Sequence, residues 1–344
     1  MMNDIDLLKG GPEAWNQLRS ARADRPDLSE ADLRDRDLAG VNLRDARMTA
    51  AKLDRSVLRR AVLSGVEFVD VVATDADFAD ADWTGATIDD CRLSHCTFAR
   101  ARLDDVVCRA SAHWCDFDSA SLERADLEGC RLQACYFANA SLADARLNHA
   151  SLEWGCLSEA DLTRAVVDGA TLDGAEMFKA TCREARFARS SLRGTILRQA
   201  DLRGTDFSGA DLTGAMLFDV DATTAVFTSA LLRKADFGGA TISGVDLANL
   251  DCEGARFGGT IADHVRFSGA NLAGATFLGT NCHSASFAGS TLVGASFDRA
   301  TLTGADFRSA DLRDCRFVYC DIAGARFDGA KMEGAYFYPS GYGT

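Results

Sequence analysis

The sequence predicts an all-β fold, a four-sided parallel β-helix, and three regularities support this prediction. A leucine, phenylalanine or similar apolar residue recurs every five residues through most of the chain. The phenylalanines recur at multiples of ten, and the only prolines, Pro12, Pro26 and Pro339, lie near the two ends. Because proline cannot donate a backbone hydrogen bond, the long stretch without it favours one uninterrupted hydrogen-bonded ladder.

The five-residue unit reads Ala, then Asp, Ser, Thr or Arg, then Leu or Phe, then two variable residues of which the second is often Gly. Its central residue recurs from Leu28 to Cys108 and again from Ala112 to Phe337, which makes 17 units followed by 46. A period of five fits neither the 3.6-residue α-helix nor the two-residue strand. It indicates a chain that turns regularly, with the central residue and the small residue two positions before it facing the interior.

The placement of phenylalanine predicts the number of sides. Eighteen of the 20 phenylalanines are central residues, separated by ten residues or a multiple of ten within each register. This alternation is expected of a four-sided coil of 20 residues with phenylalanine on two opposite faces. About 15 to 16 such coils would stack at roughly 4.8 Å each. One residue is missing between Cys108 and Ala112, and the alternation then resumes on the same faces. We therefore expect a local irregularity near residues 108–112.

The ends of the chain depart from the repeat. We expect an N-terminal helical cap at residues 1–25, the β-helix at 26–338 and a tail at 339–344. The cap is predicted because Pro12 suits the first turn of a short helix, from which Trp15 and Leu18 would cover the first coil. At the far end a terminal coil leaves core and backbone unpaired, so its aromatic residues either cover that coil or form a homodimer contact. These residues are Tyr336, Phe337 and Tyr338.

Composition argues against several functions. The net charge of −14 argues against direct nucleic-acid binding, which uses lysine and arginine. The first residues do not resemble a signal peptide, and no run of about 18 apolar residues would cross a membrane. Eleven of the 12 cysteines fall on inward positions, all but Cys156, which favours reduced core residues and a cytoplasmic location. The sequence contains no phosphate-binding loop, nucleophile elbow or metal motif, so we predict no enzymatic activity, no cofactor and no metal.

The repeat resembles the pentapeptide-repeat family, whose unit is usually written A(D/N)LXX. Matching triplets begin at Ala31, Ala125, Ala160, Ala200 and Ala310, and the resemblance covers about residues 26–338. It implies a right-handed quadrilateral β-helix. It also implies a range of functions: some members mimic B-DNA and bind DNA gyrase or topoisomerase IV, which gives antibiotic resistance, and others are effectors or secretion accessories. The DNA mimics are typically bacterial acidic rods that dimerise at their C-terminal ends, often with inserted loops that this chain lacks.

Two surfaces are candidate binding sites. Residues 61–128 carry 15 acidic residues against five arginines, and the register places six of the acidic residues on one face. We call this set the acidic face: Glu67, Asp70, Asp89, Asp90, Asp126 and Glu128. A second set, the apolar stripe, consists of outward apolar residues: Tyr136, Phe178, Ile196, Met216 and Phe218. Trp114 and Trp154 form a similar pair on a neighbouring face.

Each surface has a functional and a structural interpretation. The acidic face either engages a basic groove or is the solvated surface of a repeat that already contains aspartate. The apolar stripe either docks a partner or consists of scattered surface residues, which are common. The sequence thus predicts a protein-binding β-helix. Its more specific form is a partial DNA mimic that binds a type II topoisomerase. The alternative is a structural or secretion-associated scaffold.

Overall fold

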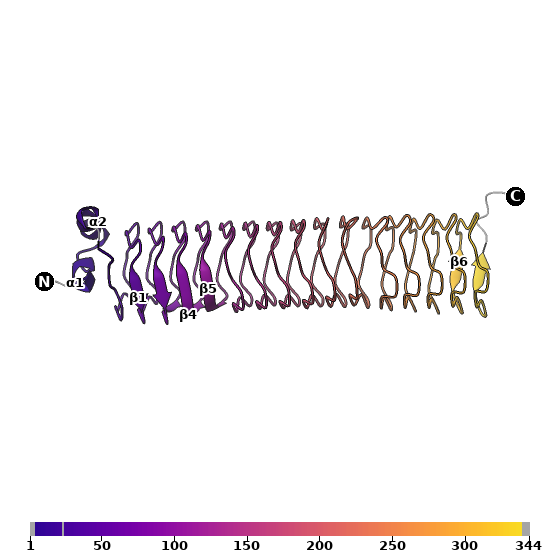
Figure 1. The fold of residues 1–344 in the computed structure, drawn as a ribbon, viewed down its shortest axis with the longest axis horizontal. Helices are drawn as coiled ribbons and strands as arrows, with labels where there is room; N and C mark the ends of the chain where they lie inside the picture. The colour runs from indigo at the N-terminus through magenta and orange to yellow at the C-terminus, as the bar shows by residue number, and fades with distance from the viewer. Residues whose placement is uncertain (1–3, 23, 339–344) are drawn as a thin grey trace. The chain divides into compact units, whose positions relative to one another are not determined.

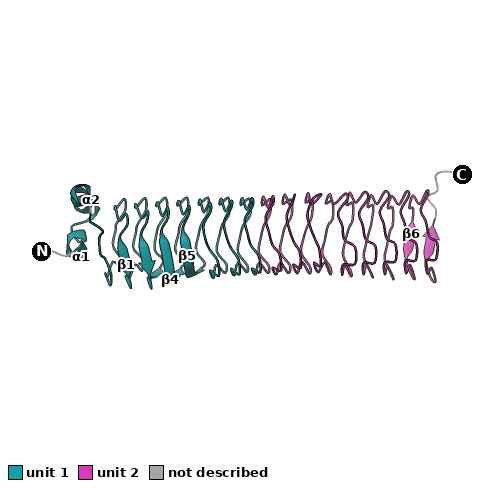
Figure 2. Cartoon of the chain, in the orientation of Figure 1, with its two compact units in different colours: residues 1–171 teal, residues 172–344 magenta. Residues whose placement is uncertain are grey.

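The computed structural model describes residues 4–22 and 24–338 and contains two compact units. Unit 1 is Met1–Thr171 and unit 2 is Leu172–Thr344 (Figure 2). Each is a β-solenoid in which parallel bridges join residues 20 positions apart, such as Ser121 to Ser141 in unit 1 and Asp251 to Asn271 in unit 2 (Figure 1). The predicted all-β, parallel, 20-residue coil is therefore confirmed.

One repeat from Leu142 to Leu147 explains why the sequence coils. Leu142, Ala145 and Leu147 are fully buried. Asp144 has a φ of 59°, a left-handed conformation that turns the chain, and the Ala145 N–H then donates to the Leu142 carbonyl at 3.0 Å. The Arg146 N–H bonds the Ala125 carbonyl of the preceding coil at 2.8 Å. Each repeat therefore closes one corner and adds one link to the ladder.

The aspartate before many central residues has a structural role. Asp161 Oδ1 accepts the backbone N–H of Thr163 at 2.9 Å, and Asp206 Oδ1 accepts that of Ser208 at 2.9 Å. This contact ties down the turn that follows the central residue, as Asx turns do. Much of the acidity of the repeat therefore serves the backbone.

Regular strands are few because most ladder contacts are single bridges. In unit 1, β1 (Arg47–Thr49), β2 (Glu67–Val69) and β4 (Thr87–Ser94) pair in parallel, and β3 (Val72–Thr74) and β5 (Val107–His113) also pair with β4. In unit 2, β6 (Arg316–Val318) pairs in parallel with β7 (Tyr336–Tyr338).

Phenylalanine fills two opposite faces of the interior, as predicted. In unit 1, Phe98 stacks on Phe117 with ring centroids 4.8 Å apart. In unit 2, Phe277 stacks on Phe297 at 4.7 Å and meets Phe267 edge-on at 5.7 Å. Stacking runs along each face and edge-to-face contacts join the two faces, both of which are favourable aromatic geometries.

The predicted irregularity lies where β5 pairs with β4. Asp89 pairs with Arg109 but Arg92 pairs with Ser111, so the residue is missing at this corner while later pairs keep the same faces. Ala112 takes the central position opposite Leu93, as predicted. Because alanine is smaller than the usual central residue, an apolar void of about 20 Å³ remains between Leu93, Ala112 and Leu132.

Two helices precede the first coil: α1 (Asp4–Leu8) and α2 (Pro12–Ala21). Trp15 is 1% exposed and donates its indole N–H to the Asn42 carbonyl at 2.7 Å, as expected of a cap. The prediction for Leu18 is wrong, since it is 39% exposed, whereas Leu8 of α1 is buried. The predicted tail at 339–344 lies outside the described residues.

Candidate protein-binding surfaces

The acidic face lies within unit 1, and the strand register places its members side by side. Parallel pairing aligns Val69 of β2 with Asp89 of β4 and Asp89 with Arg109 of β5. The outward positions of this face between residues 27 and 168 hold nine carboxylates and three arginines. The carboxylates are Asp27, Glu30, Glu67, Asp70, Asp89, Asp90, Asp126, Glu128 and Asp168, and the arginines are Arg47, Arg109 and Arg146.

Three of the six predicted carboxylates are held by nearby arginines. Glu67 pairs with Arg25 at 2.6 Å. Asp126 pairs with Arg109 at 2.8 Å, which holds the pKa of Asp126 below its ordinary value. Glu128 pairs with Arg146 at 3.0 Å. These pairs neutralise much of the charge that would otherwise face a partner.

The other three members, Asp70, Asp89 and Asp90, have few or no ionic partners among the described residues. Asp70 is 4.0 Å from Arg92, and among the described residues the carboxylates of Asp89 and Asp90 accept no hydrogen bond and form no ion pair. The three lie together where β2 ends and β4 turns its corner. Of the six predicted members of the acidic face, these three form the weakest ion pair or none among the described residues.

Sequence reasoning missed a depression beside these residues. It has a volume of about 350 Å³ and is lined by Arg92, Arg109 and Arg131 together with Asp90 and Glu128. It opens at the corner where the residue is missing, so the missing residue was the available signal. Three guanidinium groups here interrupt the acidic surface, which a uniform phosphate-like array would not do.

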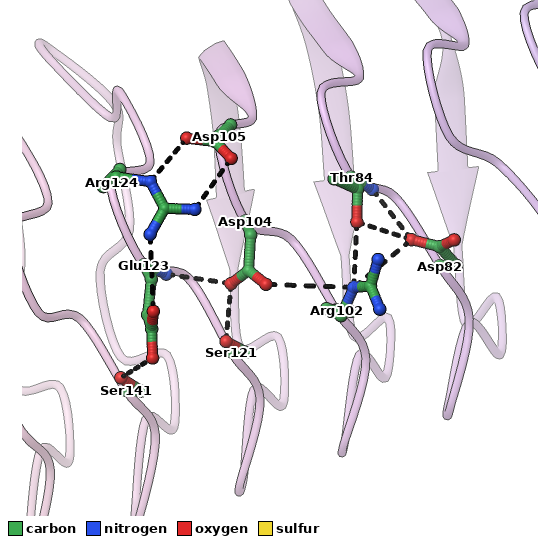
Figure 3. A network of polar contacts seen from close by, with 9 residues as sticks. All are labelled: Asp82, Thr84, Arg102, Asp104, Asp105, Ser121, Glu123, Arg124 and Ser141. Atoms are coloured by element: carbon green, nitrogen blue, oxygen red, sulfur yellow. Dashed lines mark hydrogen bonds and ion pairs between the residues drawn. The ribbon is translucent and has the colours of Figure 1, made fainter.

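A network on another face of unit 1 shows how its carboxylates are neutralised (Figure 3). Arg124 binds Asp105 through two hydrogen bonds of 2.8 and 2.9 Å and lies 3.4 Å from Glu123. Arg102 donates to the Thr84 hydroxyl at 3.0 Å and lies 3.7 Å from Asp82. These carboxylates serve coil-to-coil contacts.

The members of the apolar stripe are only partly exposed. In unit 2, Ile196 and Met216 are bridge partners, and Met216 is 44% exposed. Phe178 and Phe218 are half-buried, and the Phe218 ring lies over Gly238, where an added Cβ would come within 2.9 Å of it. Tyr136 is 52% exposed but belongs to unit 1.

The aromatic residues at the end of unit 2 are exposed. Tyr336, Phe337 and Tyr338 form β7, which pairs with β6. Phe337 is a central residue yet is 38% exposed, and the central residues Ile322 and Met332 are similarly exposed at 37% and 36%. The last described coil therefore leaves part of its core uncovered by the residues described.

The cysteines are free thiols, and ten of the 12 are buried. Several bind a backbone carbonyl of the preceding coil, as Cys130 does to Cys108 at 3.0 Å and Cys315 to Leu292 at 2.9 Å. Burial raises the pKa of Cys252 to about 12. The described residues contain no group of three or more His, Cys, Asp or Glu placed to hold a metal ion, and no helix there could cross a membrane.

The coil geometry and these surfaces define a four-sided parallel β-solenoid with short polar turns. The chain belongs to the pentapeptide repeat family: its profile matches eight copies, over residues 27–65, 67–107, 115–153, 156–194, 180–217, 251–281 and 280–317. Residues 218–250 lie outside these matches, yet Asp221 and Thr241 are still bridge partners, so the coil continues through them.

Solved structures with similarity to this chain include the pentapeptide repeat proteins QnrB1 and HetL. QnrB1, a plasmid-mediated fluoroquinolone resistance protein, is 23% identical over 53% of this chain and 90% of its own, with a TM-score of 0.34. HetL from Nostoc sp. strain PCC 7120, involved in heterocyst differentiation regulation, is 25% identical over 71% of this chain and 90% of its own, with a TM-score of 0.20. No curated protein matches the sequence.

Proposed function

We propose that the protein is a non-enzymatic cytoplasmic scaffold whose acidic face binds a basic protein surface. The main observation in support is that this face holds nine carboxylates but only three arginines. Asp70, Asp89 and Asp90, which have few or no ionic partners among the described residues, lie together on it. Carboxylates presented in this way steer a basic partner into place and set its orientation. Twelve free thiols support a reducing compartment.

The candidate partner is a type II topoisomerase such as DNA gyrase, which the acidic face would engage as a partial mimic of B-DNA. QnrB1, a protein similar to this chain, is a plasmid-mediated fluoroquinolone resistance protein. For this chain the support is the charge of the acidic face. Because arginines neutralise Glu67, Asp126 and Glu128, we assign the binding energy mainly to Asp89 and Asp90.

A gyrase supercoiling assay with the purified protein tests this proposal. The wild type should alter supercoiling at micromolar concentration, and the effect should weaken steeply as salt is raised. The double variant Asp89→Lys/Asp90→Lys should lose the effect. Its matched control, Asp75→Lys/Glu184→Lys, changes the net charge by the same amount outside the acidic face and should keep it. A wild type without effect would overturn the topoisomerase assignment.

A second candidate is a scaffold that docks a partner through the apolar stripe. The exposure of Met216 beside Ile196 favours it. Apolar docking predicts binding that tolerates salt and is lost in Phe178→Ala or Phe218→Ala. Measuring how the affinity of the protein for its partner changes with salt concentration therefore separates the two candidate functions.

We also propose that the protein forms a homodimer through β7 and the exposed central residues Ile322, Met332 and Phe337. Apolar core that would otherwise face water is a favourable contact for a second copy. Sedimentation equilibrium should show a dimer for the full chain and a monomer after truncation following residue 334. An unchanged mass, with circular dichroism showing an intact solenoid, would overturn the dimer.

A further inference from the structure

Three exposed aromatic residues lie together on one edge of unit 1, and we call them the aromatic edge: Trp114, Tyr136 and Trp154. Their exposed fractions are 58%, 52% and 75%, whereas the other two tryptophans, Trp15 and Trp83, are 1% exposed. An exposed indole ring forgoes the favourable free energy that burial of its large apolar surface would contribute. Trp114 and Trp154 therefore differ in burial from the other two tryptophans of the chain.

The ladder places these residues on three successive coils. Tyr136 is the bridge partner of Asp116 in one coil and of Cys156 in the next. Trp114 and Trp154 each precede those partners by two residues, so they lie two coils, or about 10 Å, apart. The corresponding position in the coil between them is Ala134, whose methyl group occupies little of that space.

The backbone gives no reason for an indole at either position. Trp114 and Trp154 have φ values of 57° and 60°, in the left-handed region that glycine adopts most readily. The other left-handed turns described in unit 1 hold glycine, for example Gly129 with a φ of 69°, or a residue other than Phe, Tyr or Trp. A bulky side chain in this conformation is strained. Two such tryptophans, both exposed, are better explained by a contact outside the chain.

The charges around the aromatic edge identify the kind of partner. Four nearby carboxylates, Asp116, Asp118, Glu153 and Glu159, form no ion pair within residues 4–22 and 24–338. Their hydrogen-bonding partners are neutral, such as Asn139 for Asp118 at 3.2 Å and Thr171 for Glu153 at 2.8 Å.

Among the described residues no neighbouring arginine forms an ion pair with these carboxylates, and the pKa of Arg100 is raised mainly by Asp80 and less by Asp118 and Asp116. Arg100, whose backbone N–H donates to the Asp118 carbonyl, is held by Asp80 at 2.8 Å. Arg131 lines the depression at the missing residue. Tryptophan faces attract cations, and Tyr136 adds a third ring, so aromatic rings beside carboxylates that form no ion pair among the described residues favour a cationic ligand.

We propose that the aromatic edge is a docking site for an extended segment of a protein partner that carries arginine or lysine. Each indole receives the stem and charged group of one cationic side chain, and the carboxylates bind its N–H donors. The spacing of about 10 Å fits residues i and i+3 of a polyproline II segment, which advances about 3.1 Å per residue with three residues per turn. This surface is separate from the acidic face and does not depend on the topoisomerase assignment.

The test uses labelled peptides with the repeats Arg-Pro-Pro, Gln-Pro-Pro and Glu-Pro-Pro, each four repeats long, with binding followed by fluorescence anisotropy. The Arg-Pro-Pro peptide should bind saturably and more tightly than the Gln-Pro-Pro peptide, and the Glu-Pro-Pro peptide should not bind. Trp114→Gly/Trp154→Gly should weaken the Arg-Pro-Pro complex by about tenfold or more, since two cation–π contacts are removed. The double variant keeps every carboxylate, so non-specific attraction to an acidic protein remains in both samples.

A matched control and a stability measurement keep the proposal falsifiable. His264→Gly replaces an exposed left-handed residue of unit 2, with a φ of 57°, and should leave binding unchanged. The tryptophan variants should melt at the same or a higher temperature, because glycine relieves the strained backbone. Equal binding of the Arg-Pro-Pro and Gln-Pro-Pro peptides, or undiminished binding by the double variant, would overturn the proposal. A lower melting temperature of the double variant would show a structural role instead.

Discussion

Unit 1 and unit 2 use the same five-residue repeat but differ in charge and in the residues at their turns. Unit 1 has 31 acidic and 20 basic residues, whereas unit 2 has 20 and 17. Left-handed turn positions within the solenoid hold 23 non-glycine residues and five glycines in unit 1, but 14 non-glycine residues and 18 glycines in unit 2. The repeat itself leaves the turn residues open, so one unit can present charged and aromatic side chains while the other has less strained turns.

A substitution in the core of unit 2 should have the largest effect on stability. Phe277 is fully buried and stacks between Phe257 at 4.9 Å and Phe297 at 4.7 Å. Phe277→Ala should lower the free energy of unfolding by about 3–5 kcal/mol, because neighbouring coils cannot close the cavity. Urea denaturation of the full chain measures it. A loss below about 1 kcal/mol would show that the stack is not tightly packed.

The turns can be compared by exchanging their residues. Asp75 has a φ of 55°, and Asp75→Gly should raise the free energy of unfolding by about 0.5–1 kcal/mol. Gly214, with a φ of 70° and no atom near an added Cβ, should lose about 1 kcal/mol in Gly214→Asp. Opposite signs in thermal unfolding would confirm that turn residues account for part of the difference. The same sign in both variants would refute that explanation.

The void at the missing residue provides a smaller test within unit 1. Ala112→Val should fill part of the 20 Å³ space and raise the free energy of unfolding by up to about 1 kcal/mol. The same change at the well-packed central residue Ala222, fully buried in unit 2, should destabilise by overpacking. Destabilisation at both positions would mean that the void cannot accept a side chain.

Lowering the pH should change the stability of the protein less than any of these substitutions. Arginine hydrogen bonds lower the pKa of Asp126 in unit 1 and of Asp201 in unit 2. A lowered folded pKa stabilises the fold at pH values above the unfolded pKa, near 4, and this contribution is lost as the pH falls toward the folded pKa. The urea midpoint should therefore fall between pH 5 and pH 2.5. In 1 M salt the fall should be smaller, because these carboxylates are partly exposed; an unchanged fall would point to other groups.

Much of the acidic face followed from the sequence, but the ion pairs of its carboxylates did not. Counting by 20 along the chain, with one residue removed near 110, placed Glu67, Asp89 and Asp126 on one face, and the bridges agree. The pairing of Glu67 with Arg25 did not follow, because Arg25 precedes the regular coil and its side chain reaches across to that face. The depression lined by Arg92, Arg109 and Arg131 also depends on how a corner adapts to a missing residue.

The sequence by itself determined the coil, its four sides and its inward residues, because each of these repeats locally and one period fixes them all. Phe277 and Ala145 are buried for the same reason that every central and corner residue is. Only the tertiary structure decided which outward groups remain available, since side chains on stacked coils choose partners by distance. It left the carboxylates of Asp89 and Asp90 without an ion pair among the described residues and the aromatic edge exposed, while pairing Asp105 with Arg124. The period could not distinguish between them.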